Sequence, residues 1–550
     1  MKYFKIFKKN WPEVIFFLAA LTFSWWLMWH TFIYKNGSFL IALKAWSDFA
    51  SHIPLIRSFS LGDNFPPEFP LFPGEKMRYH FLFYALVGLG EKLGIPIDWA
   101  LNFPSAISFF LLLVSIYLLA KYLFKSRFVA ILSVIFFLFN GSLSFLEFIK
   151  THPLNSSIFS AILKVEEFPA FFPYNRSSLI AGGFWNLNVF TNQRHLSSAL
   201  ALLIFSFLFV LRSSKNNTLT LKSCFLIGIL LGILPYWNGA VFIMAVVAFG
   251  TYFFLSIRLK PFKLLALLTT TILITIPQIL IIRGGNPQAL ISYHPGYLIH
   301  DQLNIPTFIK FWVLNLGLGT FLIPLGFFLS GKEAKTVFLS FLSLFLIGNL
   351  FQFSPDLATN HKFFNLFIII SNIFIAYSLV YFFQKNVIGR LMLPFFILLL
   401  TISGIIDFFA IKNDLLLTIP DFPNNPDVTW IKQNTPTNAV FLNSTYLYHP
   451  VSLAGRKIFL GWPYFSWSAG YDTDKREILR KELLGASFGN KNTICNMLKA
   501  NNIQFVSIEK TSPPDFTPNF SFWENNFLKV YNNQKSGLTI YNVTRSCLLL

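Results

Sequence analysis

The sequence predicts an α-helical polytopic membrane protein, with about 11–12 transmembrane helices, followed by a C-terminal extracytoplasmic α/β domain. The chain is 54% hydrophobic and only 12% charged, whereas soluble domains average about 25% charged residues. Apolar runs of about 18 or more residues recur through residues 1–412, and each is long enough to cross a hydrocarbon core of about 30 Å. Residues 413–550 instead alternate helix-like and strand-like patterns.

About eleven stretches are predicted to span the membrane. They are 13–33, 102–120, 128–148, 196–211, 221–237, 238–257, 263–282, 308–330, 336–352, 363–383 and 391–411. The first has no small-residue cleavage pattern after it, so we interpret it as a retained anchor. Lysines before this span predict a cytoplasmic N-terminus. With these eleven spans, every basic short loop then lies on the cytoplasmic side.

The apolar stretch 80–94 fits this count only if it does not cross fully. It is short, and Glu91 and Lys92 close it. It is either re-entrant or a span that breaks the charge rule locally.

The same topology places loops 34–79, 149–195, 283–307 and 353–362 outside, together with the tail 413–550. We therefore expect a multi-span membrane domain at 1–412 and an extracytoplasmic α/β domain at 413–550, in a prokaryotic plasma membrane. Helices are expected at 427–433, 475–484 and 493–500, strands at 439–444 and 503–508, and a hairpin at 527–531 and 538–542. Cys495 and Cys547 lie in the tail and could pair, whereas Cys224 lies within a span.

The formal net charge is +20. In a soluble protein such a charge would suggest a nucleic-acid partner. Here the Lys and Arg residues concentrate in short loops between spans, where they set topology. The sequence therefore predicts no nucleic-acid partner.

The first outside loop brings several ionisable residues together. Residues 40–61 read as an amphipathic helix at the membrane surface, with Asp48 and His52 four residues apart and thus on one face. A Pro-rich turn then carries Asp63 and Glu68. The alternative is that Asp48 only pairs with Lys44 one turn earlier, which would carry no chemistry.

Further basic residues stand where outside loops enter the membrane. Arg78 and His80 lie at the start of the stretch 80–94. Arg194 and His195 lie just before the span at 196–211, and Asn175 and Arg176 lie earlier in the same loop. His361 and Lys362 open the span at 363–383. A cationic side chain at the mouth of a span can bind a phosphate through hydrogen bonds. Alternatively, it can extend to the lipid head groups and anchor the span.

The tail contains an aromatic segment, 461–472, in which Trp462, Tyr464 and Trp467 alternate with small residues before Asp472. It could form a surface for a sugar or a lipid head group. Ordinary core packing of a small domain explains the same residues equally well. No Gly-rich phosphate loop and no Gly-x-Ser-x-Gly motif is present in the sequence, so nucleotide-sugar chemistry is not supported.

The pattern of an N-terminal span, a large outside loop with an Asp, many further spans and an outside tail resembles the GT-C superfamily of membrane glycosyltransferases. Residues 46–52 occupy the place of that family's Asp motif, and residues 65–79 resemble the segment that leads to the next membrane element. The resemblance implies a polyprenyl- or dolichyl-phosphate-linked sugar as donor, membrane lipids as surroundings, and a glycan, lipid or protein as acceptor. Some members bind a divalent metal through paired acidic motifs. The loop has no Asp-x-Asp or Glu-x-Asp, so no cofactor is firmly implied, and a divalent metal stays open as the alternative.

A catalytic hypothesis follows from these residues. Transfer from a lipid phosphate needs a base for the acceptor hydroxyl and cations for the departing phosphate. We assign Asp48 as base, with Asp63 and Glu68 in reserve. Arg194 and Lys362 are assigned to the phosphate. Arg78 and His195 are expected to help, and His52, His80 and His361 complete the expected substrate-binding set.

Two other functions remain open at this point. A flippase or transporter for lipid-linked glycans would favour ionisable or broken helices near the midplane and repeated halves. A non-enzymatic membrane assembly protein would use the tail to bind partners. Transfer of a labelled sugar to an acceptor would distinguish an enzyme from a transporter of unchanged lipid.

Overall fold

The computed structural model describes residues 2–169, 179–181, 184–256, 261–284, 291–383, 387–510 and 516–548. The chain divides into two compact units. Unit 1 comprises residues 1–31, 102–277 and 291–415, and unit 2 comprises residues 32–101, 278–290 and 416–550. The loop that follows the first span therefore groups with the C-terminal tail, which sequence order does not reveal.

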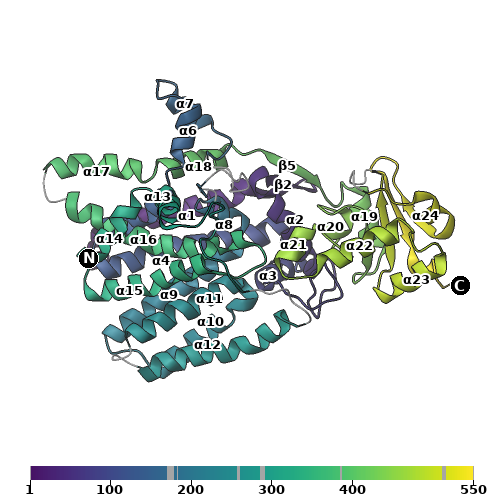
Figure 1. Ribbon diagram of the computed structural model, residues 1–550, viewed down its shortest axis with the longest axis horizontal. Helices are drawn as coiled ribbons and strands as arrows, with labels where there is room; N and C mark the ends of the chain where they lie inside the picture. The colour runs from purple at the N-terminus through teal and green to yellow at the C-terminus, as the bar shows by residue number, and fades with distance from the viewer. Residues whose placement is uncertain are drawn as a thin grey trace. The chain divides into compact units, whose positions relative to one another are not determined.

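Unit 1 is a bundle of apolar helices (Figure 1). Its helices, some of whose ends lie in unit 2, are α1 (Lys2–Thr31), α4 (Ile97–Phe124), α5 (Arg127–Leu138), α6 (Phe145–Thr151), α7 (Ile158–Lys164), α8 (Asn188–Asn192), α9 (Arg194–Lys215), α10 (Leu221–Gly232), α11 (Leu234–Leu255), α12 (Pro261–Ile282), α13 (Ile305–Leu316), α14 (Gly319–Leu329), α15 (Lys332–Leu350), α16 (His361–Phe383), α17 (Val387–Leu399) and α18 (Ile402–Lys412). A short two-stranded sheet joins β3 (Ser292–Tyr293) to β4 (Phe351–Gln352).

The predicted membrane class is confirmed. Among the described residues seven helices are long and apolar enough to cross a bilayer, or up to nine if two bent pairs each count as one span. The pairs are α13 with α14, bent by 86°, and α17 with α18, bent by 44°. Each of the predicted stretches contains helix, but α5 and α10 have only 12 residues. At 1.5 Å per residue they cover about 18 Å, less than a hydrocarbon core.

The break between α13 and α14 has a local cause. Gly317 follows α13 with φ +54°, a backbone conformation that favours glycine. A Cβ atom there would lie 2.2 Å from the backbone oxygen of Gly141, so only a glycine allows the two chains to approach this closely. The backbone N–H of Leu143 also donates to the carbonyl of Leu314.

Helix α16 forms the centre of unit 1. It packs against α5, α14, α15 and α11, and 16 of its residues are buried. Helix α12 shows the opposite pattern, because large apolar side chains such as Leu273 and Leu280 are exposed on it. An apolar surface of this kind is what lipid tails require.

The basic loops of unit 1 meet one another at one end of the bundle. Glu13 of α1 pairs with Lys121 and Arg127. Lys215 pairs with Glu333 at 2.7 Å. Lys263 donates to the carbonyl of Leu219.

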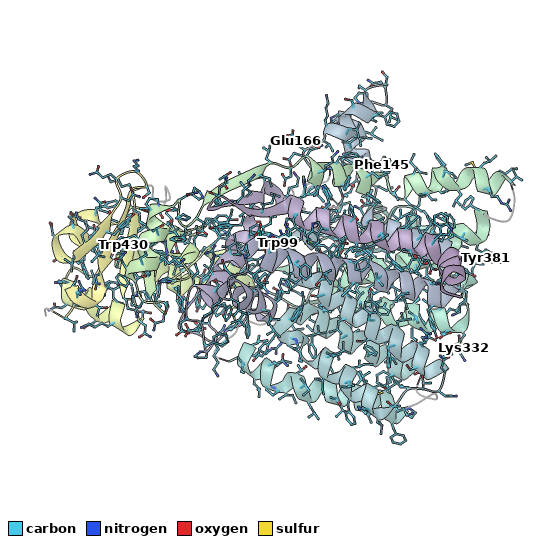
Figure 2. The ribbon with its side chains drawn as sticks, turned by 180° about the vertical axis from the view of Figure 1, so that it is seen from behind. Trp99, Phe145, Glu166, Lys332, Tyr381 and Trp430 are labelled. Carbon is cyan, nitrogen blue, oxygen red and sulfur yellow. A yellow bond between two sulfur atoms is a disulfide. The ribbon has the colours of Figure 1, made fainter. Side chains whose placement is uncertain are left out.

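Figure 2 places Lys332, at the start of α15, and Tyr381, near the end of α16, at the same end of this bundle. The ion pairs of Glu13 and Lys215 at this end agree with the one-sided arrangement of basic loops on which the predicted topology depends.

Unit 2 begins with a hairpin that the sequence analysis did not predict. Strands β1 (Phe32–Lys35) and β2 (Ser38–Ala42) pair antiparallel around Asn36-Gly37, and both turn residues have positive φ. Asn-Gly is the usual two-residue hairpin turn. Strand β5 (Leu416–Pro420) pairs with β2 and so ties the tail to the loop.

The helix predicted over 40–61 is wrong in its first residues, because 40–42 belong to β2 and 43–45 form a 3-10 turn. Helix α2 (Trp46–Ser60) then follows, and 11 of its 15 residues are buried. It packs against α3 (Leu82–Lys92) and α20 (Pro450–Leu453). It is therefore a buried helix of unit 2 and not an amphipathic surface helix. Helix α3, in the stretch 80–94, has 11 residues and covers about 16 Å, too little to cross a bilayer.

The tail forms the expected α/β fold. Its five-stranded sheet has the order β7-β6-β8-β10-β9. The strands are β6 (Val440–Asn443), β7 (Lys457–Ile458), β8 (Phe505–Glu509), β9 (Leu528–Asn532) and β10 (Leu538–Asn542). Strand β6 runs parallel to β7 and β8, and β10 runs antiparallel to β8 and β9.

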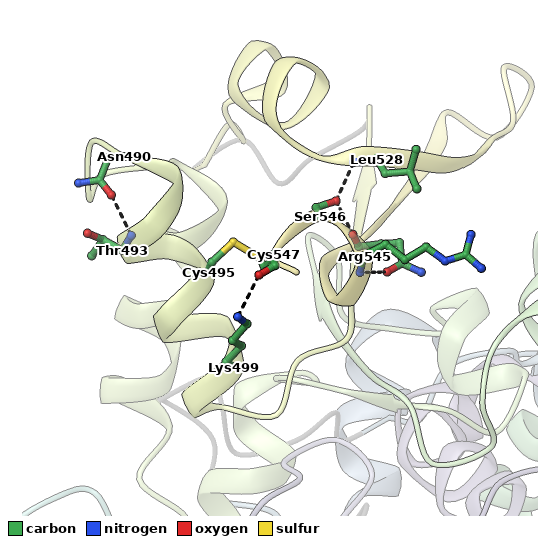
Figure 3. The surroundings of a disulfide bond; sticks show 9 residues. Asn490, Thr493, Cys495, Lys499, Leu528, Arg545, Ser546 and Cys547 are labelled. Atoms are coloured by element: carbon green, nitrogen blue, oxygen red, sulfur yellow. Dashed lines mark hydrogen bonds between the residues drawn. A yellow bond between two sulfur atoms is a disulfide. The ribbon is translucent and has the colours of Figure 1, made fainter. Parts of the chain in front are cut away.

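The helices and the hairpin predicted for the tail are confirmed within a few residues. The helices are α19 (Pro426–Asn434), α21 (Pro463–Ser468), α22 (Thr473–Leu484), α23 (Lys491–Ala500), α24 (Phe520–Asn526) and α25 (Val543–Ser546). A disulfide joins Cys495 of α23 to Cys547 (Figure 3). Lys499 also donates to the carbonyl of Cys547.

Candidate functional site

Asp48 lies in the first turn of α2, where a helix dipole favours a negative charge. Its side chain is half-buried. The hydroxyl of Ser51 donates to its backbone carbonyl at 2.9 Å. Asp48 is thus fixed at a helix terminus but still reaches solvent, as a base that meets a substrate requires.

Two tyrosines lie in the electrostatic field of Asp48. Desolvation raises the pKa of the Tyr79 phenol, and the charge of Asp48 raises it further. The same two causes, in the same order, raise the pKa of Tyr448. Both phenols therefore stay protonated near the carboxylate. Tyr448, from the tail, also donates to the carbonyl of Trp46 at 2.6 Å.

The two histidines of the first loop lie in the same unit. His52 is 2% exposed and stacks on the ring of Tyr84, with the centroids 4.5 Å apart. His80 stacks on Tyr79 at 3.9 Å. His80 therefore contacts Tyr79, one of the two tyrosines near Asp48.

Asp63 and Glu68, the alternative candidates for the base, have different surroundings from Asp48. Glu68 forms an ion pair of 2.9 Å with Lys457 of the tail. Asp63 is exposed, and its backbone N–H donates to the carbonyl of Thr437. We therefore keep Asp48 as the first candidate for the base.

Arg78 is almost completely enclosed. Its Nη1 atom donates to the carbonyl of Gly470 at 2.5 Å, and its Nη2 atom lies 2.8 Å from Glu75. Its guanidinium carbon lies 4.9 Å from the centre of the Tyr471 ring. These contacts hold the first loop on the tail.

In unit 1 the two predicted cationic segments come together. The Nε2 atoms of Gln193 and His361 lie 3.4 Å apart. The other ring nitrogen of His361 lies 2.9 Å from the amide nitrogen of Asn365. Lys362 is half-exposed beside them and adds a positive charge. Two segments that lie 168 residues apart in the sequence thus form one polar group.

Arg194 occupies a different environment, with only 1% of its surface exposed. Its Nη1 atom donates to Asn102 at 3.0 Å, and its Nη2 atom donates to Thr31 at 2.8 Å. Its Nε atom donates to the carbonyl of Thr191 at 2.5 Å. Arg194 therefore connects α9 to α1 and α4. His195 beside it is buried, and Asn175 and Arg176 lie outside the described residues.

Within the part of the chain that the structure describes, no group of three or more His, Cys, Asp or Glu side chains could hold a metal ion. Sequence reasoning missed Tyr448 as a neighbour of Asp48. No sequence signal could have found it, because 402 positions separate Tyr448 from Trp46.

No protein-family model matches the chain, and no curated protein matches its sequence. Several solved structures share its fold. It matches the arabinofuranosyltransferase AftD from Mycobacteria with a TM-score of 0.54 and 11% identity, over 96% of this chain and 41% of that one. It matches ArnT from Cupriavidus metallidurans with a TM-score of 0.50 and 9% identity, over 98% of this chain and 99% of that one.

A third similar structure is the archaeal oligosaccharyltransferase AglB from Archaeoglobus fulgidus, in complex with an inhibitory peptide and a dolichol-phosphate. That match has a TM-score of 0.47 and 14% identity, over 91% of this chain and 69% of that one. Together with the spans and the mixed sheet of the tail, the two matches at 0.54 and 0.50 establish the fold. This chain therefore has a GT-C-like fold, which it shares with these two structures.

Proposed function

We propose that this protein is a membrane glycosyltransferase that moves a sugar from a polyprenyl-phosphate-linked donor to an acceptor on the extracytoplasmic face. The observation that carries the proposal is the fold, which the arabinofuranosyltransferase AftD shares over 96% of this chain. The half-buried Asp48 beside two protonated tyrosines supplies a carboxylate suited to the chemistry.

In the proposed reaction, an acceptor hydroxyl oxygen attacks the anomeric carbon of the donor. The bond between that carbon and the phosphate oxygen breaks, and polyprenyl phosphate leaves with the electron pair. Asp48 takes the proton of the hydroxyl. Tyr79 and Tyr448 stay protonated. The hydroxyl of Tyr448 already donates to the carbonyl of Trp46, so Tyr79 is the phenol that can donate a hydrogen bond to the substrate near Asp48.

A phosphate-binding role is proposed for the polar group within unit 1, formed by Gln193, His361 and Lys362. Lys362 supplies a positive charge, and Gln193 and His361 supply hydrogen-bonding nitrogens. Charge-assisted hydrogen bonds of this kind stabilise a leaving phosphate. Arg194 is assigned an indirect part, because its guanidinium already bonds to Asn102, Thr31 and Thr191.

The extracytoplasmic location of the tail is part of the proposal. The disulfide between Cys495 and Cys547 supports it, since disulfides persist in oxidising compartments. The basic loops gathered at one end of unit 1 support it independently, because such loops mark the cytoplasmic side.

The test uses the purified full-length protein in nanodiscs, without nucleotide, and a panel of radiolabelled polyprenyl-phosphate sugars. Asp48→Asn should fold and bind the donor, but its turnover should fall at least about 100-fold. Asp474→Asn, at an exposed carboxylate in the first turn of α22, is the matched control and should keep normal turnover. Normal transfer by a well-folded Asp48→Asn protein would exclude Asp48 as the base.

A second candidate function is transport of a lipid-linked glycan. The observation in its favour is the presence of two broken helix pairs, since transporters often bind substrate where spanning helices are interrupted. Radiolabel that crosses a sealed vesicle in unchanged lipid would support transport. Radiolabel that appears in an acceptor would support the transferase.

A further inference from the structure

The tail presents aromatic side chains at the surface around the short helix α21. Trp462 precedes this helix and is 44% exposed, and Tyr464 is 40% exposed. The ring of Trp467 lies 6.0 Å from that of Tyr464. We call Trp462, Tyr464 and Trp467 the aromatic shelf. Large aromatics at a surface are a typical feature of binding sites, because each offers a broad apolar face at little conformational cost.

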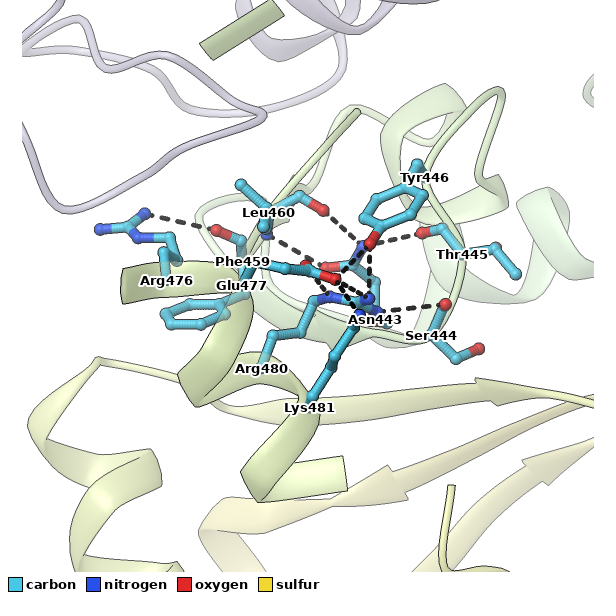
Figure 4. A network of polar contacts seen from close by, with 10 residues as sticks. All are labelled: Asn443, Ser444, Thr445, Tyr446, Phe459, Leu460, Arg476, Glu477, Arg480 and Lys481. Atoms are coloured by element: carbon cyan, nitrogen blue, oxygen red, sulfur yellow. Dashed lines mark hydrogen bonds and ion pairs between the residues drawn. The ribbon is translucent and has the colours of Figure 1, made fainter. Parts of the chain in front are cut away.

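The shelf rests on a rigid polar base. The ring of Tyr446 meets that of Trp462 edge-on at 5.7 Å. The hydroxyl of Tyr446 donates to Glu477 at 2.7 Å and accepts from Arg480 at 2.6 Å. Arg480 also donates to the carbonyl of Asn443, as Figure 4 shows. The hydrogen-bonded network therefore fixes Tyr446, the ring against which Trp462 packs, and this reduces the ordering entropy that binding would cost.

The same turn of the chain reaches the Asp48 group. Tyr446 supports Trp462, and Tyr448, two residues later, donates to the carbonyl of Trp46 in the first turn of α2. Two residues span at most about 7 Å between Cα atoms. One short turn of the chain therefore contacts both the shelf and the first turn of the Asp48 helix, and all of these residues belong to unit 2.

The polar side chains next to the shelf are of both signs. Asp472 pairs with Lys475 at 3.0 Å, and Glu477 pairs with Arg480 at 2.8 Å. A sugar ring presents C–H groups on its face and hydroxyls around its edge, so it fits an aromatic face with donors and acceptors beside it. An anionic lipid surface would instead favour a cluster of Lys and Arg.

We propose that the aromatic shelf is the subsite for an acceptor glycan, whose sugar stacks on Trp462 while a hydroxyl of the same glycan reaches Asp48. This proposal rests on the proposed transferase function and narrows its acceptor to a carbohydrate. Tyr464 supplies a second stacking face. Glu477 and Asp472 accept hydrogen bonds from the sugar hydroxyls.

Binding of free sugars tests the proposal without the transfer reaction. The full-length protein in detergent is titrated with neutral hexasaccharides of glucose, mannose and galactose, and binding is followed by saturation-transfer NMR and calorimetry. At least one hexasaccharide should bind the wild-type protein, and Trp462→Ala should weaken that binding at least tenfold. Trp430→Ala is the matched control, because Trp430 stacks on Tyr531 elsewhere in the tail.

Absence of binding by all three hexasaccharides would overturn the proposal, and so would equal binding by the Trp462→Ala and Trp430→Ala proteins. If brominated lipids in nanodiscs quenched the wild-type protein more than the Trp462→Ala protein, the shelf would lie in the bilayer, and this would also overturn the proposal. Asp48→Asn separates the two proposals. That variant should keep hexasaccharide binding while it loses transfer, so a failure of the transferase proposal leaves the binding result intact.

Discussion

The Nη2 atom of Arg57 lies 2.7 Å from Oδ2 of Asp421, and both side chains are buried in unit 2. Arg57 belongs to the Asp48 helix, whereas Asp421 follows strand β5 of the tail, 364 positions later. Tyr34 donates to the same oxygen of Asp421 at 3.1 Å, and Glu91 lies 3.3 Å from the Nε atom of Arg57. This network joins the first loop to the tail and so fixes the helix that carries Asp48.

Removal of Asp421 should therefore destabilise unit 2. Loss of one partner from a buried ion pair costs about 3–5 kcal/mol, because the remaining charge stays desolvated. Since Glu91 still faces Arg57, we expect Asp421→Asn to lie at the lower end of this range. The midpoint of thermal unfolding, followed by tryptophan fluorescence, measures the change.

Lys475→Gln provides the control, because it breaks an exposed pair with Asp472 that is worth under about 1 kcal/mol. Equal unfolding midpoints for the Asp421→Asn and Lys475→Gln proteins would show that the buried network does not stabilise the unit.

Tyr448 is expected to position Asp48 for the proposed reaction. It adopts a positive φ of 49°, an uncommon conformation for a residue with a side chain, and its hydroxyl bonds to Trp46. Tyr448→Phe removes only this hydroxyl. We expect kcat to fall about tenfold, which corresponds to about 1.4 kcal/mol of transition-state stabilisation, with little change in donor KM.

Tyr531→Phe is the matched control, since Tyr531 also donates from the tail, to Asp427 at 2.7 Å. Equal kcat values for the Tyr448→Phe and Tyr531→Phe proteins would show that the Tyr448 hydroxyl has only a structural role.

Much of the fold could be predicted from the sequence, because membrane spans and tail elements are local patterns. Long apolar runs and alternating strands depend on neighbouring residues alone. The short helices α5 and α10 and the two bent pairs were not predicted, because hydropathy does not show where a turn interrupts an apolar run.

The surroundings of Asp48 depended on contacts that no local pattern contains. Its place in the first loop was predicted, but its neighbour Tyr448 comes from the tail. The helix start was misplaced because the Asn36-Gly37 hairpin signal was overlooked, although that dipeptide between two apolar runs predicts a tight turn. Likewise, the enclosure of Arg194 depends on helices α1 and α4, which its own neighbours cannot reveal.

Arg194 and Lys362 should respond differently to loss of charge. Arg194→Gln removes the buried hydrogen bonds from the guanidinium to Asn102, Thr31 and Thr191, so it should lower the unfolding midpoint. Lys362→Gln should leave stability nearly unchanged and weaken donor binding about 10- to 100-fold, the effect of one charged hydrogen bond. Donor affinity by calorimetry and the unfolding midpoint, measured on both variants, test this difference. A stable Arg194→Gln protein that loses donor affinity would reassign Arg194 to the phosphate.

The disulfide offers a test of topology. Cys495 and Cys547 should resist a membrane-impermeant maleimide in intact cells and react only after reduction. The bond closes a sequence separation of 52 residues, so its removal by Cys495→Ser with Cys547→Ser should destabilise the tail by about 4 kcal/mol. Absence of labelling in intact cells even after reduction, with labelling once the membrane is permeabilised, would place the tail in the cytoplasm, and the extracytoplasmic site would then be excluded.

His449 should make the tail sensitive to acid. Burial lowers the pKa of its imidazole from 6.5 to about 3. The unfolded chain therefore binds more protons than the folded chain between these values, and the free energy of unfolding falls as the pH decreases through this window. The slope contributed by His449 is at most about 1.4 kcal/mol per pH unit.

His449→Asn retains an acceptor for the backbone N–H of Val451, which Nδ1 of His449 now accepts at 3.2 Å, but it does not titrate. Unfolding midpoints measured between about pH 4 and pH 7 should therefore fall less steeply in this variant than in the wild type. His300→Asn, at an exposed position of unit 1, should keep the wild-type slope. Because the absolute stability of His449→Asn can also change through packing, the slope and not the midpoint decides the result, and parallel slopes for the wild type and His449→Asn would exclude this histidine as the acid-sensitive group.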